Sequence, residues 1–403
     1  MEACQLGTCP LSGRTGYSAV MEGKFMKKIK IVFLHYCLVC GGAEKALFDL
    51  ITLLDKDKFE VEVFVQQPGG EWDQKFIDAG IKLVYDYSCR RPTWNPVKKL
   101  GNLRKKLAVK KALKNQGAGL LNICCPGADI VVNYSAWDCD ELPFVPGAKT
   151  VKYIHGDPAN WSVYGDEARQ QKALLSRYDR IVCVSKNNAD SYRRISGLQD
   201  PVIALHNPLY SEQVHELAKE PVELPQGAPL LCAVGRLAEQ KAFERLIVIH
   251  KRLLQQGVFH NLVIVGEGPD HNFLDRLIRA LEVEKTVTLA GYQANPYPYM
   301  KNCTFLVSSS LYEGLPVIVM EGLSLGIPVV APIPSVAEAF GDEFCGLITD
   351  NTMEALEEGI RKMLTDEDLF QRAKAGAEKR SVYLDGKHMV REVEEMFLSL
   401  MEE

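Results

Sequence analysis

Residues 28–54 read KIKIVFLHYCLVCGGAEKALFDLITLL, a short apolar run followed by a glycine loop and an amphipathic stretch. The apolar core at 31–34 is too short to cross a membrane and has the length of a buried parallel strand. After the paired glycines, apolar residues recur at positions 46, 47, 50 and 54 with helical spacing. The stretch therefore predicts a strand, a loop and a helix, in that order.

The same alternation continues along the chain on both sides of a seam at 208–229, which is rich in proline and charge. Before the seam, apolar runs predict strands at 59–67, 128–135, 149–156 and 179–185. After it, the pattern predicts strands at 229–237, 261–268, 286–292, 303–309 and 327–332, and helices at 243–256, 270–282 and 316–325. Strands that alternate with helices form parallel sheets, so we expect an α/β protein with two doubly wound sheets that face a cleft.

The seam also sets the predicted domains. We expect an N-terminal domain at 26–208, a C-terminal domain at 209–385 and a last helix at 386–403. Apolar residues share one face of that helix, which we expect to pack back on the N-terminal domain: Met389, Val393, Met396 and Leu400. Residues 1–25 show no periodicity, and we interpret them as a disordered extension.

Composition narrows the class of protein. The 403 residues are 47% hydrophobic and 25% charged, as in soluble globular proteins. The net charge of −5 argues against general nucleic-acid binding. The segment 315–334 is long enough to span a bilayer, but Glu321 and several prolines within it argue against a spanning helix. Because the first 25 residues lack the apolar segment of a secretory signal, we expect a cytoplasmic protein.

The twelve cysteines do not predict a metal or redox site. Cys183 and Cys232 lie inside apolar runs and are typical of small buried hydrophobic residues. Cys37 and Cys40 form a single C-x-x-C with no second pair at zinc spacing. A zinc or redox role for this pair is therefore the weaker alternative.

Two loops that follow predicted strands carry groups suited to phosphate. Gly41 and Gly42 allow close approach of a ligand at a helix start, although a Gly-Gly turn is more often structural. Arg236 and Lys241 flank a loop that opens the next helix. A guanidinium forks onto phosphate oxygens and an ammonium adds a point charge, so this pair suits a diphosphate. The alternative is a solvated loop.

The stretch 308–331, SSSLYEGLPVIVMEGLSLGIPVVA, carries two carboxylates in an apolar context. Pro316 favours the first turn of a helix, so Glu313 falls in the preceding loop and Glu321 inside the helix. Gly314 and Leu315 would offer main-chain N–H groups at the positive end of this helix. A buried carboxylate is costly, which favours a bound polyol such as ribose at Glu321; the alternative is pairing with a nearby cation.

Taken together, these motifs resemble glycosyltransferase family 4, whose members are retaining enzymes with the two-domain GT-B fold. The resemblance covers nearly the whole chain from Met26. The matching stretches are GGAE at 41–44, YIHGD around His155, VSKNNADSY at 184–192, HNP at 206–208, VGRLAEQKAFERLI at 234–247, VGEGP at 265–269, LAGYQANPYPYM at 289–300 and the E-x7-E pair Glu313 and Glu321.

The resemblance implies a nucleotide-sugar donor, UDP-linked, that is held mainly by the C-terminal domain. Arg236 and Lys241 would hold the diphosphate, Glu321 the ribose, and Glu313 would lie near the transferred sugar. A lone buried histidine is more often structural, and only the family match favours His155 as a group that approaches this sugar. His155, Arg236, Lys241 and Glu313 are thus the candidate catalytic groups. Further donor contacts are expected from Gly41, Gly42, Gly235, Gly266, Gly291, Gly314 and Leu315.

One residue departs from the family pattern. Ala242 follows Lys241 where the family usually has glycine, which adds a methyl group to the phosphate loop. Fixed cations and a helix N-terminus can stabilise a departing nucleoside diphosphate, so we expect no metal cofactor. Three D-x-D triplets are interpreted as loops or caps: Asp55/Asp57, Asp138/Asp140 and Asp366/Asp368. The family implies transfer with retention at the anomeric carbon.

A basic segment indicates the acceptor side. Ten lysines and arginines and no acidic residue lie between Asp86 and Asp129. Apolar residues at 97, 100, 103 and 107 form a helical stripe within 97–114. Such a helix suits an anionic membrane that carries a lipid-diphosphate-linked acceptor, or else a solvated surface. The first interpretation predicts a role in surface polysaccharide assembly.

Two other classes stay open on sequence alone. A different GT-B enzyme, such as a nucleotide-sugar epimerase or a phosphorylase, shares the fold. A non-catalytic sugar-binding protein is the third class, which the presence of Arg236, Lys241, Glu313 and Glu321 disfavours.

Overall fold

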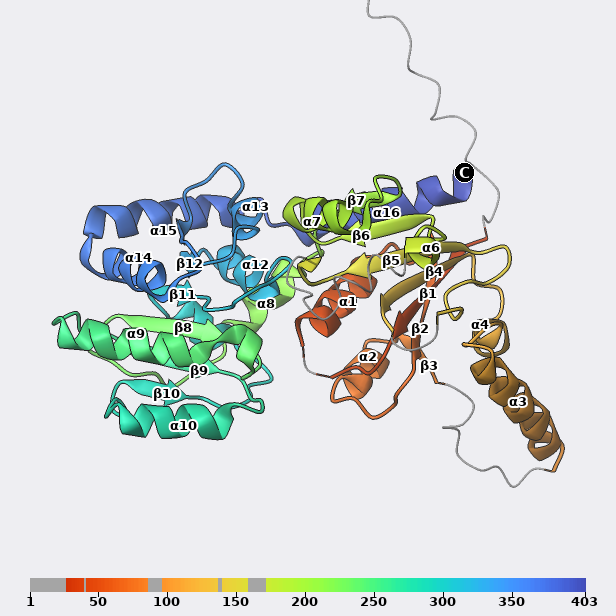
Figure 1. Ribbon diagram of the computed structural model, residues 1–403, viewed down its shortest axis with the longest axis horizontal. Coiled ribbons are helices and arrows are strands. Elements are labelled where there is room, and N and C mark those ends of the chain that lie inside the picture. Colours follow the sequence, from red (N-terminus) through yellow and green to blue (C-terminus); the bar gives the residue numbers. More distant parts are fainter. Residues whose placement is uncertain (1–26, 40, 86–95, 137–139, 159–171) are drawn as a thin grey trace, which may run out of the picture.

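The computed structural model describes residues 27–39, 41–85, 96–136, 140–158 and 172–403, apart from the side chains of 96–102. Within these residues, two parallel sheets lie side by side and each is covered by helices (Figure 1). This is the doubly wound α/β architecture that the alternating strand and helix patterns predict. Residues 1–25 and Cys40, on which predictions were made above, lie outside the described residues.

The first sheet has seven parallel strands in the order β3-β2-β1-β4-β5-β6-β7. These strands are β1 (Ile29–His35), β2 (Phe59–Val65), β3 (Lys82–Tyr85), β4 (Ile130–Ser135), β5 (Lys149–Ile154), β6 (Arg180–Cys183) and β7 (Val202–Ala204). The order runs outward from β1 in both directions, so the direction of winding reverses between β1 and β4. In open α/β sheets, ligands bind at the carboxyl ends of strands at such a switch point.

The second sheet repeats this winding in the order β10-β9-β8-β11-β12-β13. Its strands are β8 (Leu230–Val234), β9 (Asn261–Val265), β10 (Val287–Leu289), β11 (Phe305–Val307), β12 (Val329–Ala331) and β13 (Gly346–Ile348). Its switch point lies between β8 and β11. The loop after β8 carries Arg236 and Lys241, and the loop after β11 leads to Glu313, so the sheet topology brings both candidate loops to one place.

Helices cover both faces of each sheet (Figure 1). The helices associated with the first sheet are α1 (Gly42–Leu53), α2 (Asp73–Asp78), α3 (Pro96–Lys114), α4 (Leu120–Cys124), α6 (Lys172–Leu175) and α7 (Lys186–Ser196). Those that follow are α8 (Ser211–Leu217), the short 3-10 helix η3 (Glu239–Lys241), α9 (Phe243–Gln255), α10 (His271–Ala280), α11 (Tyr297–Lys301), α12 (Val317–Ser324), α13 (Val336–Phe340), α14 (Met353–Thr365), α15 (Glu367–Ser381) and α16 (Gly386–Glu402).

The seam is more ordered than its sequence pattern indicates. Helix α8 lies inside it, and Val214 of this helix is fully buried in an apolar cluster that also contains Leu209 and Val184. Most of the rest of this cluster comes from the second sheet and its helices, and Met389 of the last helix also belongs to it. A non-local apolar contact between the two halves therefore stabilises a helix that lacks a sustained period of its own.

The last helix returns to the first sheet. Phe397 of α16 is fully buried and meets the rings of Phe33 and Phe59 edge to face, with ring centroids 6.3 and 6.1 Å away. The carboxylate of Glu394 accepts a hydrogen bond of 2.7 Å from the main-chain N–H of Asp55. Helix α16 thus ties the end of the chain to the first strands.

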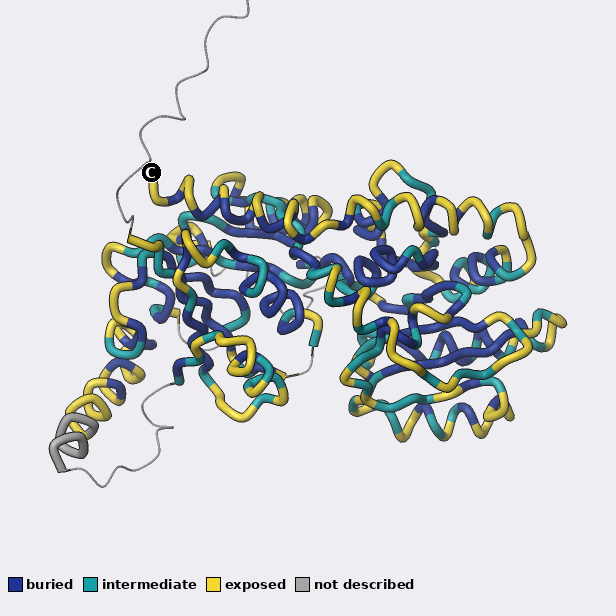
Figure 2. The backbone as a smooth tube through the Cα atoms, turned by 180° about the vertical axis from the view of Figure 1, so that it is seen from behind, coloured by how far each residue is buried: buried dark blue, intermediate teal, exposed yellow. Residues whose placement is uncertain are grey.

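Helix α3 extends away from the body of the protein (Figures 1 and 2). Its last turns are anchored by Val109 and Ala112, which are buried, whereas Leu103 and Leu107 are 54% and 61% exposed. Among the described residues, no helix combines the length and the hydrophobicity needed to cross a bilayer.

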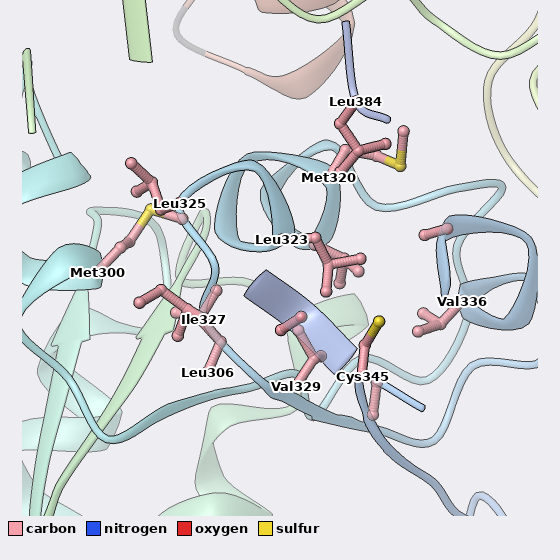
Figure 3. Packing of buried hydrophobic residues seen from close by; sticks show 14 of the residues in the cluster. Met300, Leu306, Met320, Leu323, Leu325, Ile327, Val329, Val336, Cys345 and Leu384 are labelled. Carbon is pink, nitrogen blue, oxygen red and sulfur yellow. The ribbon is translucent and has the colours of Figure 1, made fainter. Parts of the chain in front are cut away.

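Helix α12 carries Glu321 and is fixed by the core of the second sheet. Figure 3 shows Leu323 of this helix close to Val329 and Cys345, and Met320 beside Leu384. The neighbour of Glu321, Gly322, faces Leu306 of β11 so closely that a Cβ there would overlap the leucine side chain. Tight helix–strand packing therefore holds Glu321 at a fixed position.

Candidate active site

The loops at the carboxyl ends of the two sheets meet at the turn before α12. A Cβ placed on Gly42 would lie 3.7 Å from Cγ2 of Val317, the first residue of α12. On the same turn, the carbonyl oxygen of Gly314 accepts a hydrogen bond of 3.1 Å from the Ser185 hydroxyl. Gly42 and Ser185 follow strands of the first sheet, so this turn is the meeting point of the two halves.

Lys241 stands beside this turn. Its ammonium pairs with the carboxylate of Glu313, which also accepts a hydrogen bond of 2.9 Å from the Ser310 hydroxyl. The Ser309 hydroxyl donates to the Lys241 carbonyl oxygen at 2.7 Å, which fixes the loop. The predicted phosphate-binding cation and the predicted sugar-side carboxylate are thus direct neighbours.

Arg236 lies at the carboxyl end of β8 and is exposed. It forms no ion pair or hydrogen bond with a described residue, so its guanidinium is available to a ligand. Its positive charge opposes the effect of burial on the pKa of Glu44, which places it near the GGAE loop of the other domain. Arg236 and Lys241 therefore lie on the cleft side of the second sheet, as the sequence predicts.

Glycines let the donor-side loops approach one another. A Cβ on Gly266 would overlap the carbonyl oxygen of Gly235, and one on Gly268 would overlap that of Leu237. The Gly266 N–H donates to the carbonyl oxygen of Gly291 at 2.9 Å. These contacts give a structural reason for glycine at 266 and 268. Contact of Gly235, Gly266 and Gly291 with a donor stays a prediction.

The turn before α12 presents unpaired donors. In the described part of the chain, neither the Gly314 N–H nor the Leu315 N–H has a hydrogen-bond acceptor. Pro316 is the residue that caps α12 rather than the first helical residue, a shift of one position from the sequence expectation. Unpaired N–H groups at a helix start form an anion-binding site, which suits the diphosphate predicted here.

The GGAE loop leads into α1, and the carboxylate of Glu44 turns back toward the start of this helix. Glu44 is the third residue of the helix, and a Cβ on Gly41 would overlap its Oε2 atom. Burial raises the pKa of Glu44 to about 7, although its own main-chain N–H and the charge of Arg236 act in the opposite direction. The Nε2 atom of His35 lies 3.6 Å from Glu44, and burial lowers the pKa of His35 to about 4.

His155 follows β5 and points its ring into the first sheet. Its Nε2 atom lies 3.1 Å from the Tyr134 carbonyl oxygen. Since a carbonyl can only accept, Nε2 carries the proton and Nδ1 is an acceptor. Nδ1 is buried and has no partner among the described residues, and burial lowers the pKa of His155 to about 3. The ring is therefore neutral and offers one unsatisfied acceptor, which a donor hydroxyl could fill.

Glu321 is 5% exposed and already has partners. Its Oε1 atom accepts a hydrogen bond of 2.7 Å from the Tyr297 hydroxyl and lies 3.8 Å from the ammonium of Lys45 on α1. Burial raises the pKa of Glu321, while Lys45 and Tyr297 counteract this. The cation-paired alternative is thus present in the structure, and Oε2 has no hydrogen-bond partner among the described residues. Glu313 and Glu321 belong to separate hydrogen-bond networks.

The sequence motifs do not reveal three groups near the cleft. These groups are Lys45, Tyr297 and Glu338. Each contacts a residue far away in the chain, so no spacing along the sequence predicts the contact. The only local signal was their position: Lys45 directly follows the GGAE motif, and Tyr297 lies in the LAGYQANPYPYM stretch.

Two of the D-x-D triplets have local structural roles, one in a turn and one at a helix start. Asp55 accepts from the N–H of Asp57 at 2.9 Å, and Asp366 accepts from that of Leu369 at 3.0 Å. Asp138 lies outside the described residues. Over the described ranges, no group of three or more His, Cys, Asp or Glu side chains is arranged to hold a metal ion.

Comparison with known proteins places this geometry in a family. The model for glycosyltransferase family 4 matches residues 40–213, and the model for glycosyl transferases group 1 matches residues 214–380. The chain is a member of glycosyltransferase family 4. The first model covers the first sheet from β2 to β7, and the second covers the whole second sheet, so this glycosyltransferase carries both halves of the family architecture.

Two curated bacterial relatives of this glycosyltransferase are themselves named as glycosyltransferases. It is 26% identical over 372 residues to the N-acetylgalactosamine-N,N'-diacetylbacillosaminyl-diphospho-undecaprenol 4-alpha-N-acetylgalactosaminyltransferase of Campylobacter jejuni, a match that covers 90% of this chain and 98% of the relative. It is also 26% identical over 363 residues to the lipopolysaccharide core biosynthesis glycosyltransferase LpsE of Rhizobium meliloti, with 90% and 96% covered.

Solved structures confirm the GT-B fold. HepE from Anabaena, crystallised with UDP-glucose, superposes with a TM-score of 0.69 at 17% identity, over 92% of this chain and 99% of that chain. A glycosyltransferase from Rickettsia africae superposes equally well, with a TM-score of 0.69 over 93% and 99% of the two chains. At this level of identity, the likeness shows the fold alone.

Proposed function

We propose that this glycosyltransferase transfers a hexosyl or N-acetylhexosaminyl group from a UDP-sugar, with retention, to a lipid-diphosphate-linked glycan. The observation that carries the proposal is the turn before α12. There the Lys241–Glu313 pair, the unpaired N–H groups of Gly314 and Leu315, and Gly42 of the other domain come together. This set provides a cation, helix-start dipoles and close backbone approach, which are the groups a diphosphate needs.

The proposed chemistry is stabilisation of the leaving group. As the bond between the sugar and UDP breaks, negative charge grows on the diphosphate. Arg236, Lys241 and the start of α12 offer fixed positive charge and dipoles before the reaction begins, so little reorganisation is required. Because these groups belong to the chain, we propose that no divalent cation is needed. Contacts between the domains would exclude water and limit hydrolysis of the donor.

The acceptor would arrive from a membrane surface. Helix α3 exposes Leu103 and Leu107 one turn apart, next to Arg104, Lys106 and Lys110, all of which are exposed. Basic residues beside exposed leucines suit the headgroup region of an anionic bilayer. We propose peripheral attachment at the cytoplasmic face, with a role in surface polysaccharide assembly. The naming of the Campylobacter jejuni relative for a diphospho-undecaprenol acceptor supports this acceptor class.

A donor and acceptor assay tests the proposal. Purified protein is incubated with a panel of UDP-sugars, with and without a short-chain lipid-diphosphate glycan, and with EDTA in a parallel series. We expect one UDP-sugar to release UDP only when acceptor is present, an α-linked product by NMR, and equal rates in EDTA. Sugar interconversion without acceptor would indicate an epimerase instead, and loss of activity in EDTA would contradict the metal-free mechanism.

Replacement of Lys241 tests the leaving-group role. We expect Lys241→Ala to lower kcat/KM by at least about tenfold, the effect of roughly 1.4 kcal/mol in the transition state. Lys251→Ala, on the partly exposed side of α9, is the matched control and should keep the wild-type value. An unchanged kcat/KM in Lys241→Ala would contradict the site.

Membrane attachment is tested separately. We expect replacement of Arg104, Lys106 and Lys110 by Gln to reduce sedimentation with anionic liposomes, and high salt to reduce that of the wild type. Equal sedimentation of both proteins would favour a solvated helix.

A further inference from the structure

The buried carboxylate Glu321 receives its counter-charge from the other domain. Lys45 belongs to α1, which begins at the glycine loop of the first sheet, and its ammonium lies 3.8 Å from Oε1 of Glu321 on α12. Both residues are nearly buried, at 8% and 5% exposure. The same α1 brings Gly42 against Val317 at the start of α12, so these two helices touch at two points.

The two carboxylate oxygens of Glu321 differ in their contacts. Oε1 is occupied by the Tyr297 hydroxyl and faces Lys45. Oε2 accepts no hydrogen bond from a described residue, and it is not enclosed in the way the fully buried orphan atoms are. An ionised carboxylate oxygen has two acceptor sites. Oε2 is thus the atom left for the hydroxyl groups of a ligand.

We propose that Lys45 is a positioning residue for the donor nucleotide: it reaches from the N-terminal domain, holds Oε1 of Glu321 together with Tyr297, and so presents Oε2 to the ribose. The inference rests on the proposed donor site and adds a residue to it. Because Lys45 and Glu321 lie on different domains, the ribose site is complete only when the domains are closed. UDP binding and domain closure then favour each other.

Electrostatics gives the proposal a pH signature. Burial raises the pKa of Glu321, Lys45 and the Tyr297 hydrogen bond lower it, Asp49 on α1 raises it, and Lys75 on α2 lowers it. Removal of the Lys45 charge leaves burial and Asp49 less opposed, so the pKa rises further. At a given pH a larger share of Glu321 is then protonated, so the acid limb of the UDP affinity profile should lie at higher pH than in the wild type.

The experiment measures UDP binding by calorimetry from pH 6 to pH 9. We expect Lys45→Gln to weaken UDP binding by about tenfold or more at pH 7 and to shift the acid limb of the affinity profile to higher pH. Lys45→Arg keeps the charge and should restore most of the affinity. Lys58→Gln is the matched control, because Lys58 forms ion pairs with Asp55 and Glu394 at the amino end of β2, away from the cleft.

The single variant carries a risk of misfolding. Lys45 also pairs with Asp49, which is 1% exposed, and loss of one partner leaves a buried charge. The double variant Lys45→Gln/Asp49→Asn removes both charges and should keep the fold, as checked by circular dichroism. It should still bind UDP more weakly than the wild type, with a smaller shift of the acid limb, because the Asp49 charge that raises the pKa of Glu321 is also removed.

A double-mutant cycle tests whether Lys45 affects UDP affinity through Glu321. If Lys45 acts through Glu321, Lys45→Gln should add no further loss to a Glu321→Ala protein. Wild-type affinity and pH profile in both Lys45 variants would overturn the positioning role, and so would additive losses in the cycle. Failure of the proposed function looks different, because the wild-type protein itself would then not bind UDP.

Discussion

Ala242 stands where the family usually has glycine, and its backbone has the conformation that favours glycine. Its φ of 48° and ψ of 45° lie in the left-handed region between η3 and α9. For a residue with a Cβ, this conformation costs about 1–2 kcal/mol of free energy, whereas for glycine it costs almost none. Its methyl group is buried, which recovers part of this cost. We expect Ala242→Gly to leave the free energy of unfolding unchanged or to raise it by up to about 1 kcal/mol.

The matched control for this change is Ala375→Gly in the middle of α15, where alanine is exposed and helical. There glycine should cost about 1 kcal/mol. Urea unfolding of both variants measures the difference. An equal loss at both positions would show that the left-handed conformation at Ala242 carries no strain.

Glu44 provides a pH test at the residue scale. Its pKa of about 7 in the folded protein lies above the ordinary value of 4.5 because the carboxyl is buried. The folded state therefore holds the proton more tightly than the unfolded chain. The stability linked to this proton is fully present below pH 4.5 and is lost as pH rises through 7. We expect Glu44→Gln to raise the melting temperature at pH 8 and to leave it unchanged near pH 4.

The comparison isolates Glu44 because His35 is present in both proteins. A stabilisation that is equal at pH 4 and pH 8 would contradict the proton linkage. A stabilised variant with lower activity would show that the cleft retains a carboxylate at the expense of stability.

At the residue scale, the sequence motifs identify residues that the structure brings together. Lys241 and Glu313 end loops after two strands that the topology makes neighbours, and the structure pairs them. The motifs did not predict that Lys45 would face Glu321, because that contact depends on how the two domains dock and not on spacing along the chain. The roles of these residues toward a donor are still predictions.

At the scale of elements, the turn before α12 joins the halves. A Cβ on Gly314 would overlap the His155 carbonyl oxygen and crowd Val184 and Asn188. We expect Gly314→Ala to keep the domains apart while each domain stays folded, because the obstacle lies between them. Small-angle scattering should report a larger radius of gyration, with unchanged circular dichroism and a loss of transfer activity.

The control for this turn is Gly42→Ala, whose Cβ would meet Val317 at an ordinary contact distance of 3.7 Å. It should keep the wild-type radius of gyration. If Gly314→Ala is as compact as wild type, the main chain of the turn can shift, and the close approach is not required for docking.

Elements differ in how well the sequence predicts them. Strands β1, β4 and β8 are apolar runs bounded by loops, and they form where the pattern places them. Strands β7 and β13 span three residues each, too few to show a period. Helix α8 has no sustained apolar period either. It is held by a distant contact, because Val214 packs in the apolar cluster between the halves. Patterns along a chain predict elements whose partners are local or periodic, and those three depend on distant partners.

For the whole molecule, Glu338 links the domains at a second place. Its carboxylate on α13 accepts hydrogen bonds of 2.7 and 2.9 Å from the N–H groups of Lys186 and Asn187, at the start of α7 in the other half. His206 lies 3.1 Å from the same carboxylate. An anion at a helix N-terminus satisfies unpaired donors and the helix dipole. Glu338 thus forms a link between the two halves in addition to the pair of Lys45 and Glu321.

This link predicts how closure depends on Glu338 and on pH. Burial raises the pKa of Glu338, but the hydrogen bonds from His206, Asn187 and Lys186 outweigh it and hold the pKa below its ordinary range. Its contribution to closure is present above about pH 4.5 and is lost as pH falls through the lowered pKa. We therefore expect Glu338→Ala to enlarge the radius of gyration at pH 7 and to raise the KM for the donor more than it lowers kcat. Glu343→Ala is the matched control, since Glu343 pairs with Lys379 inside the C-terminal domain. If Glu338→Ala stays as compact as that control and binds donor equally well, the two domains are held by their apolar contact alone, and the carboxylate only caps α7.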